Sequence, residues 1–284
     1  MYKKSKIILW TTIGLVCTML ITPVDAETIT FGVYTSDKPT AMYRKFKPIL
    51  EYLEGRLGRE GRNADIKIKI YPSYSGALDA IVNGEVDFAR FGPASYVMAK
   101  ERNKDVRLLA MEHKKNQKRF YGIFIVPKSS SITSLNEVKG KSFAFGDKNS
   151  TIGRYLSQAE LVKAGIYAKD LKSYVYLDRH DKVALAVAAG NYDAGVVKEN
   201  TYKKYSESKG LKKIARFPNV TKPWVARAGF DEKIFKALQQ GLLELKDKKI
   251  LKNLRQDGFL VADDDDYKFV RNGMQRAKEF GDNS

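Results

Sequence analysis

The sequence predicts an α/β protein of two lobes, with one lobe inserted into the other. Short apolar and β-branched runs alternate along the chain with segments whose apolar residues recur at helical spacing. One complete set of such alternations, residues 141–197, lies between two apolar strands, residues 120–126 and 223–226. The chain has 284 residues, of which 43% are hydrophobic, enough for the cores of one or two domains. Two strands that cross between lobes are typical of a hinged architecture.

In the first lobe, residues 28–34 predict a strand, and residues 66–70 alternate strictly between apolar and polar, as a half-buried strand does. A helix should lie between them, because apolar residues recur at helical spacing from Phe46 to Leu57; Pro48 should start or kink it. After these elements we expect a helix over 77–82 capped by Ser75, a strand over 86–91, and a helix that begins at Pro93.

The inserted lobe should contain strands and helices in alternation, followed by a helical C-terminal part. The expected strands are 141–145, 173–177 and 192–197, and the expected helices are 152–164, 181–189, 231–245, 247–254 and 264–280. We therefore place residues 27–126 and 223–284 in the first lobe and residues 127–222 in the second. The acidic run 263–266 indicates a helix N-terminus, since it lacks the Gly and the distal Glu of a calcium loop.

The N-terminus has the pattern of a signal peptide over residues 1–26. Lysines at 3, 4 and 6 precede a largely apolar run over residues 7–21, and Pro23 and Ala26 then provide a break and a small residue for cleavage. An uncleaved anchor is the alternative. A lipoprotein is disfavoured because Val16, not a small residue, precedes Cys17. We expect an exported protein.

Composition limits the chemistry that the chain can perform. One Cys and two His exclude an intramolecular disulfide and make a Cys- or His-rich metal centre improbable, so we expect no metal and no cofactor. The formal net charge is +18, but the basic residues are dispersed and accompany no nucleic-acid-binding motif. We interpret them as a solvated basic surface and expect no nucleic-acid partner.

The most informative stretch is residues 143–153, FAFGDKNSTIG. A buried strand there leads through a polar turn to Ser150 and Thr151 at the start of a helix. Unpaired N–H groups of a first helical turn, together with two hydroxyls, suit a tetrahedral oxyanion. Ordinary N-capping by the same hydroxyls is the alternative, and the residues alone do not decide between the two.

This stretch resembles the ligand loop of the phosphate/phosphite/phosphonate-binding proteins that serve ABC importers. Further matches are VDFARFGPASYV at 86–97, Tyr121 in its strand, HD at 180–181, YDAG at 192–195 and PWV at 223–225. The resemblance implies a type II periplasmic-binding-protein fold, α/β lobes joined by two hinge strands, that closes over a phosphorus oxyanion. It also implies a non-enzymatic, monomeric, periplasmic protein whose partner is an ABC transporter permease.

Carried over residue by residue, the resemblance gives a candidate site. Tyr74 and Tyr121 match ligand-contacting tyrosines, Ser150 and Thr151 match the hydroxyl donors, and His180 matches a ligand-side histidine. Each has an alternative role: the tyrosines in packing, and the other three residues in helix capping. Ser95 and the loop residues Thr35 and Ser36 are further candidates for lining the site, since ligands gather beyond the carboxyl ends of α/β strands.

One position departs from the family pattern. Ile152 stands where the family often has a third hydroxyl residue, so one side-chain donor is lost or the ligand presents an apolar group there. We also find no acidic residue to pair with a ligand amine, which argues against 2-aminoethylphosphonate.

Two other functions use the same residues. A periplasmic sensor of the same fold could pass its ligand-bound state to a membrane kinase. A hydrolase could use Ser150, Asp178 and His180, but the sequence has no Gly-x-Ser-x-Gly turn and no metal-ligand pattern.

Overall fold

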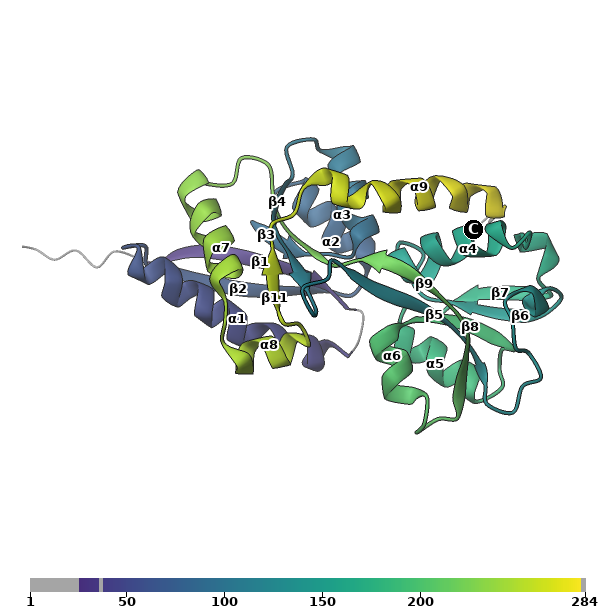
Figure 1. Ribbon diagram of the computed structural model, residues 1–284. Coiled ribbons are helices and arrows are strands. Elements are labelled where there is room, and N and C mark those ends of the chain that lie inside the picture. The colour runs from purple at the N-terminus through teal and green to yellow at the C-terminus, as the bar shows by residue number, and fades with distance from the viewer. Residues whose placement is uncertain (1–25, 36–37, 282–284) are drawn as a thin grey trace, which may run out of the picture.

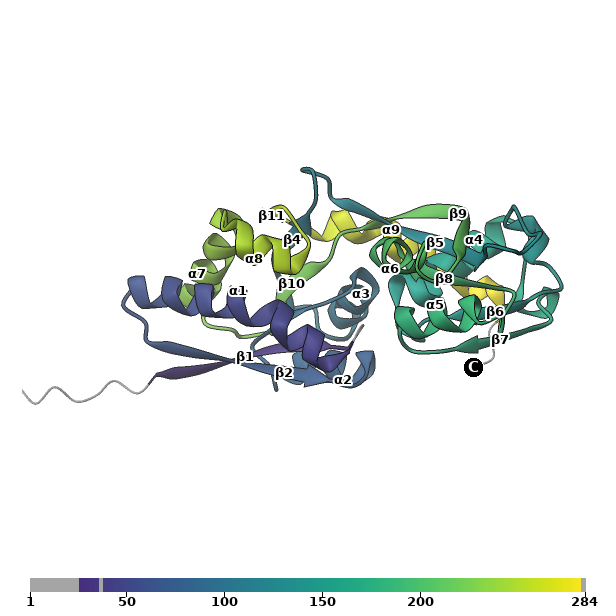
Figure 2. The ribbon, with the colours of Figure 1, turned by 90° about the horizontal axis from the view of Figure 1, so that it is seen from below.

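The computed structural model describes residues 26–35 and 38–281 of the chain. These residues form two lobes side by side, each built on a β-sheet with helices on both faces (Figures 1 and 2). The predicted signal peptide lies outside the described residues, except for its last residue, Ala26. Within the described ranges, no helix has both the length and the apolar character needed to cross a membrane.

The sheet of the first lobe is mixed. Its strands, in spatial order, are β11 (Gly258–Leu260), β4 (Arg107–His113), β10 (Pro223–Ala226), β3 (Phe88–Arg90), β1 (Glu27–Tyr34) and β2 (Ala64–Tyr71). One face packs on α1 (Pro39–Arg59), α7 (Glu232–Glu244) and α8 (Lys248–Leu254), and the other on α2 (Tyr74–Val82) and α3 (Pro93–Arg102). The strands β1, β2 and β3 run parallel, so their carboxyl ends share one edge.

The sheet of the second lobe follows the same plan. Its spatial order is β7 (Ser173–Tyr176), β6 (Ser142–Phe145), β8 (Ala194–Lys198), β5 (Arg119–Pro127) and β9 (Leu211–Val220). A π-helical turn (Thr151–Tyr155) and α4 (Leu156–Lys163) cover one face, and α5 (His180–Ala188) and α6 (Glu199–Tyr205) cover the other. The parallel strands β6, β7 and β8 likewise share one carboxyl edge.

The two apolar strands expected to cross between the lobes are central strands of the sheets. β5 pairs with β8 and β9, so residues 119–126 belong to the second sheet and not to the first lobe as predicted. β10 pairs with β3 and β4 in the first sheet. A continuous apolar run is what a strand buried on both faces requires, and this explains the misplacement. The chain crosses instead at residues 114–118 and 221–222, and a hydrogen bond from Thr221 N to Lys118 O (2.9 Å) joins the two crossings.

The C-terminal helix α9 (Lys268–Ala277) links both lobes. It packs on α3 in the first lobe and on α4 in the second, and Phe280 after it lies in the second-lobe core (Figure 1). The predicted division, which gave residues 223–284 to the first lobe, therefore does not hold for the last part of the chain.

Most predicted elements are present at nearly the expected bounds. Two helices begin earlier than predicted: α1 starts at Pro39 and runs through Pro48, and α2 is capped by Ser73, whose Oγ accepts from Gly76 N at 3.1 Å. The sequence analysis missed β4, β9, β11 and α6. In β9, buried residues do not alternate regularly with exposed ones, and a register shift interrupts its pairing with β5.

Candidate ligand-binding site

The carboxyl edges of the two sheets face each other across a small cavity of about 30 Å³, here called the inner pocket. A buried water needs roughly 10–15 Å³, so the inner pocket holds a group of only a few non-hydrogen atoms. The side chains that line it are Tyr34, Tyr74, Arg90, Gly92, Pro93, Phe120, Ser150, Thr151, Ile152, His180, Lys198, Asn219 and Lys222. Both lobes contribute to it.

Four helical segments begin at the inner pocket. Tyr74 is the first residue of α2, Pro93 of α3 and His180 of α5, while Ser150 caps the π-helical turn that leads into α4. The first turn of a helix presents unpaired N–H groups and a partial positive charge. Their convergence makes this cavity suited to an anion.

On the second-lobe side, Ser150 and Thr151 are held with their hydroxyl protons available. Ser150 Oγ accepts from Gly153 N at 2.9 Å, and Thr151 Oγ1 accepts from Ala94 N of the first lobe, also at 2.9 Å. Both residues are buried. Because each oxygen already accepts an N–H, its own O–H can donate to a ligand.

On the first-lobe side, Tyr34 is oriented in the same way. Its hydroxyl accepts from Gly92 N and from Ser95 Oγ (3.3 Å), which leaves its own proton to donate. Burial raises the pKa of Tyr34 to about 12, against the hydrogen bonds from Ser95 and Gly92, which lower it. Its ring stacks on Tyr74 at 3.7 Å between centroids, and burial also raises the pKa of Tyr74 well above 10. Both tyrosines remain neutral O–H groups at physiological pH.

Gly92 lets the two sides approach. A Cβ on this residue would lie 2.8 Å from the Tyr34 hydroxyl oxygen and 3.4 Å from Thr151 Oγ1. A larger residue would therefore displace one of the two hydroxyls, which explains glycine here.

Arg90 brings a buried positive charge to the pocket wall, and Glu112 holds it in place. Their side chains pair through Nε–Oε1 at 2.8 Å and a second nitrogen to Oε2 at 2.9 Å, and both residues are almost fully buried. Gln256 and Trp224 also donate to the Glu112 carboxylate. Burial raises the pKa of Glu112, but the charge and hydrogen bonds of Arg90 outweigh it and lower that pKa to about 2.

Lys198, Lys222 and Asn219 complete the wall. Burial, together with the charges of Arg90, Lys198 and Lys45, holds the pKa of Lys222 well below its usual range. Asn219 is 1% exposed, and neither its amide nitrogen nor its amide oxygen has a hydrogen-bond partner in the protein. An anion bound here would relieve the repulsion among the cations and could accept from the Asn219 amide.

One carboxyl group lies close to these donors. Asp147, in the turn before Ser150, accepts from Asn149 N at 2.7 Å. Burial, with a smaller effect of the Asp178 charge, raises its pKa from 3.8 to about 6, against the hydrogen bond from Asn149 N, which lowers it. Its charge also raises the pKa values of Tyr34 and Tyr74, so it acts on the inner pocket.

The structure brings five of the six predicted ligand residues together: Tyr74, Ser150, Thr151, Ile152 and His180. Tyr121 lies apart from them, in a second cavity of about 210 Å³ that we call the outer pocket; the neighbouring Phe120 lines both cavities. The Arg216 guanidinium lies 4.7 Å from the centroid of the Tyr121 ring.

Two of the three further candidates, Thr35 and Ser95, do not line the inner pocket. Thr35 is buried and donates to Pro72 O at 2.9 Å. Ser95 contacts a lining residue instead, by donating a hydrogen bond to the Tyr34 hydroxyl. Ser36 lies outside the described residues.

The sequence analysis missed Tyr34, Arg90, Lys198, Asn219 and Lys222. Signals for three of them were present: Tyr34 ends a predicted strand and Lys198 directly follows another, where ligands gather, and Arg90 is a charged residue inside a predicted strand. Asn219 carried no such signal because β9 was not predicted, and Lys222 carried none because it precedes the amino end of a strand.

A metal centre has no candidate in residues 26–35 and 38–281, where no three His, Cys, Asp or Glu side chains are grouped to hold an ion.

Comparison with known proteins agrees with this geometry. Residues 31–267 match the family described as "ABC transporter, phosphonate, periplasmic substrate-binding protein". The chain belongs to this family. The resemblance inferred from the motifs is thereby confirmed.

Two relatives and one solved structure illustrate the membership. "Phosphate-import protein PhnD" of Mycolicibacterium smegmatis is 26% identical over 207 residues, which cover 69% of this chain but only 63% of that protein. "Probable ABC transporter phosphite binding protein PhnD1" of Prochlorococcus marinus is 25% identical over 234 residues, 74% of this chain and 78% of that protein. The structure of PhnD1 from Prochlorococcus marinus in complex with methylphosphonate has a TM-score of 0.80 at 22% identity, covering 89% of this chain and 99% of that one. The fold is the predicted type II periplasmic-binding-protein fold.

Proposed function

We propose that this member of the phosphonate-binding family captures one phosphorus oxyanion in the inner pocket and delivers it to the permease of an ABC importer. The observation that carries the proposal is the convergence of four helix N-termini and the Ser150, Thr151 and Tyr34 hydroxyls on a cavity of about 30 Å³. Such a cavity fits phosphate, phosphite or methylphosphonate. The protein is proposed to bind without converting its ligand, as an exported periplasmic monomer.

Closure is proposed to occur at the two chain crossings, residues 114–118 and 221–222, because the strands on either side of them are tied into sheets. The hydrogen bond between Ala94 N and Thr151 Oγ1 joins the lobes at the pocket itself. A ligand held by both sides would therefore stabilise the closed arrangement.

The test is titration calorimetry of Ser150→Ala and Thr151→Ala with methylphosphonate and with phosphate. Each variant should bind at least about tenfold more weakly, since a lost hydrogen bond to a charged group costs about 1.5–3 kcal/mol. Asp247→Ala is the control: the Asp247 side chain also caps a helix, α8, whose N-terminus does not lie at the inner pocket. Unchanged affinity in both pocket variants, or an equal loss in the control, would contradict the proposal.

A further inference from the structure

The outer pocket adjoins the inner one. The two cavities share Phe120, Lys198 and Lys222, and the outer one has about seven times the volume, 210 against 30 Å³. A group bound in the inner pocket therefore has room to carry a substituent outward past Phe120.

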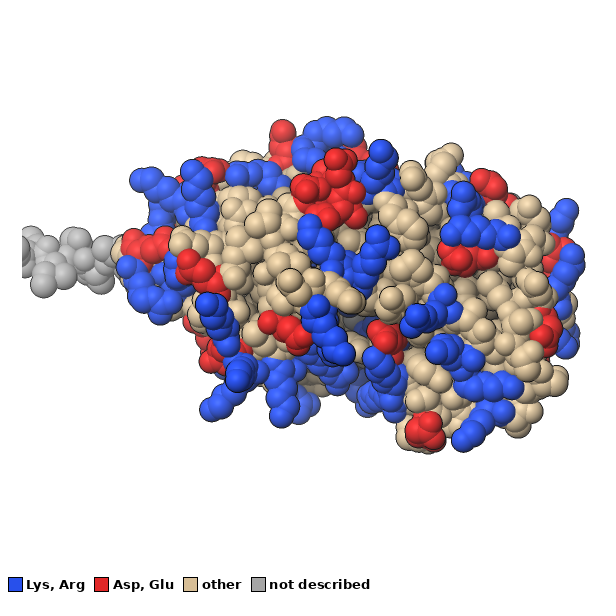
Figure 3. Space-filling model, in the orientation of Figure 1, with Lys and Arg blue, Asp and Glu red and all other residues tan. Residues whose placement is uncertain are grey.

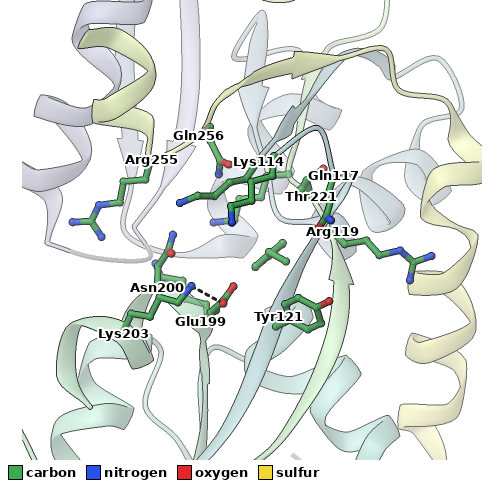
Figure 4. Close-up of a pocket in the computed structure, with 14 residues that line it drawn as sticks. Lys114, Gln117, Arg119, Tyr121, Glu199, Asn200, Lys203, Thr221, Arg255 and Gln256 are labelled. Atoms are coloured by element: carbon green, nitrogen blue, oxygen red, sulfur yellow. Dashed lines mark ion pairs between the residues drawn. The ribbon is translucent and has the colours of Figure 1, made fainter. Parts of the chain in front are cut away.

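The chemistry of the outer pocket is cationic. Lys114, Lys198 and Lys222 line it, as do Lys115, Lys203, Arg119 and Arg255, and Glu199 is the sole acidic residue among its lining side chains. Glu199 is already paired with Lys203, at 2.6 Å (Figure 4). Arg119 and Arg255 extend away from the cavity to opposite sides, so their charges lie outside it.

Lys and Arg side chains are spread over the face seen in Figure 3, and several of them lie in its middle, where the two lobes meet. Lys222 Nζ lies 5.5 Å from the centroid of the Phe120 ring, and both residues line both pockets.

The outer pocket also contains a buried polar group that lacks a partner. Thr221 is 3% exposed, and its Oγ1 has no hydrogen-bond partner in the protein. Leaving a buried hydroxyl unpaired costs free energy, and a ligand oxygen in the pocket would pair with it. This is independent of the charge and points to the same kind of ligand.

We propose that the outer pocket binds a second anionic group of the ligand, so that the protein prefers phosphonates or phosphate esters with a carboxylate or a further phosphate on their substituent. The inference rests on the proposed function of the inner pocket. It excludes cationic substituents, because Lys114 and Lys115 would repel a ligand amine and the one carboxylate of the lining, Glu199, is already paired with Lys203.

The experiment compares three ligands by titration calorimetry on the full mature chain. 3-Phosphonopropionate should bind at least about tenfold more tightly than propylphosphonate, in which a methyl group replaces the carboxylate, and 2-aminoethylphosphonate should bind most weakly. Affinities of 3-phosphonopropionate and propylphosphonate within twofold of each other would overturn the inference while leaving the proposed function intact. If none of the three ligands binds, and methylphosphonate does not bind either, both this inference and the proposed function are overturned.

Substitutions in the outer pocket test whether the carboxylate of 3-phosphonopropionate binds there. Lys114→Gln should reduce the preference for 3-phosphonopropionate over propylphosphonate about three- to tenfold, and Thr221→Val should reduce it as well. Lys114 is exposed, so its substitution leaves the core intact. Lys67→Gln, on the opposite edge strand β2, removes the same charge at a 63% exposed side chain and should leave the preference unchanged. An equal loss in Lys67→Gln would show a general charge effect and refute the site.

Discussion

The two sides of the inner pocket are built differently. On the second-lobe side, the donors Ser150 and Thr151 lie in one continuous turn, and the Oγ of Ser150 is held by the backbone three residues on. On the first-lobe side, Tyr34 and Arg90 end separate strands and are held by Gly92, Ser95 and Glu112, which come from other parts of the chain. Ser150 is thus held locally and Thr151 by one hydrogen bond from Ala94 N of the first lobe, whereas the first-lobe donors depend on several distant parts of the packed fold.

This difference predicts what mutations do on each side. Removing the Ser150 hydroxyl should cost ligand affinity and little stability. Removing the support of a first-lobe donor should cost stability first, because a buried charge or hydroxyl is left without its partner.

The substitution Glu112→Gln should have the largest effect, and that effect is on stability. It leaves the Arg90 guanidinium buried without a counter-charge, and the free energy of unfolding should fall by about 3–5 kcal/mol. Urea unfolding measures this. Asp79→Asn is the control, because it breaks an exposed Arg102–Asp79 pair of similar length, 2.7 Å, and should cost at most about 1 kcal/mol.

The Arg90–Glu112 pair also predicts how the free energy of unfolding depends on pH. The pKa of Glu112 is about 2 in the fold against an ordinary 4.5, so its contribution is complete above pH 4.5 and is lost as the pH falls toward 2. The stability difference between wild type and Glu112→Gln should therefore shrink over that range. A difference that stays constant would show that the ion pair does not stabilise the fold.

A smaller effect is expected at Asp147. Its pKa of about 6 means that it is largely neutral at pH 5 and charged at pH 7.5, where it repels a bound anion. Asp147→Asn should bind methylphosphonate several-fold more tightly than wild type at pH 7.5 and about equally at pH 5. Calorimetry at both pH values tests this, and the ligand's own ionisation cancels in the ratio. The exposed Asp65→Asn serves as control; a ratio that does not change with pH contradicts the assignment.

The substitution Ile152→Ser should have the smallest effect, a change in the preference between phosphate and methylphosphonate. Ile152 lines the inner pocket while most of its side chain packs in the second-lobe core. The added hydroxyl should tighten phosphate relative to methylphosphonate by a few-fold, because an oxygen gains a donor and a methyl group does not. Ile152→Val, which adds no donor, should leave the ratio unchanged. Equal changes for both ligands would show that position 152 does not face the ligand.

The difference between the two sides of the inner pocket also explains which site residues could be predicted from the sequence. Ser150, Thr151 and Ile152 lie within one motif, so their grouping was predictable from the chain itself. Arg90 and Lys222 reach the pocket only because β3 and β10 are neighbours in the first sheet, and that pairing was not predicted. Tyr121 was misplaced because neighbouring residues on a strand point to opposite faces, and Phe120 is the one that reaches the inner pocket.

The most direct test of the account is a crystal structure of the protein with methylphosphonate. We expect the phosphonate oxygens within hydrogen-bond distance of the Ser150 and Thr151 hydroxyls from one lobe and of the Tyr34 hydroxyl from the other, with the methyl group toward Ile152. A ligand outside the inner pocket, or one that touches a single lobe, would contradict the claim that the two sides together form one anion site.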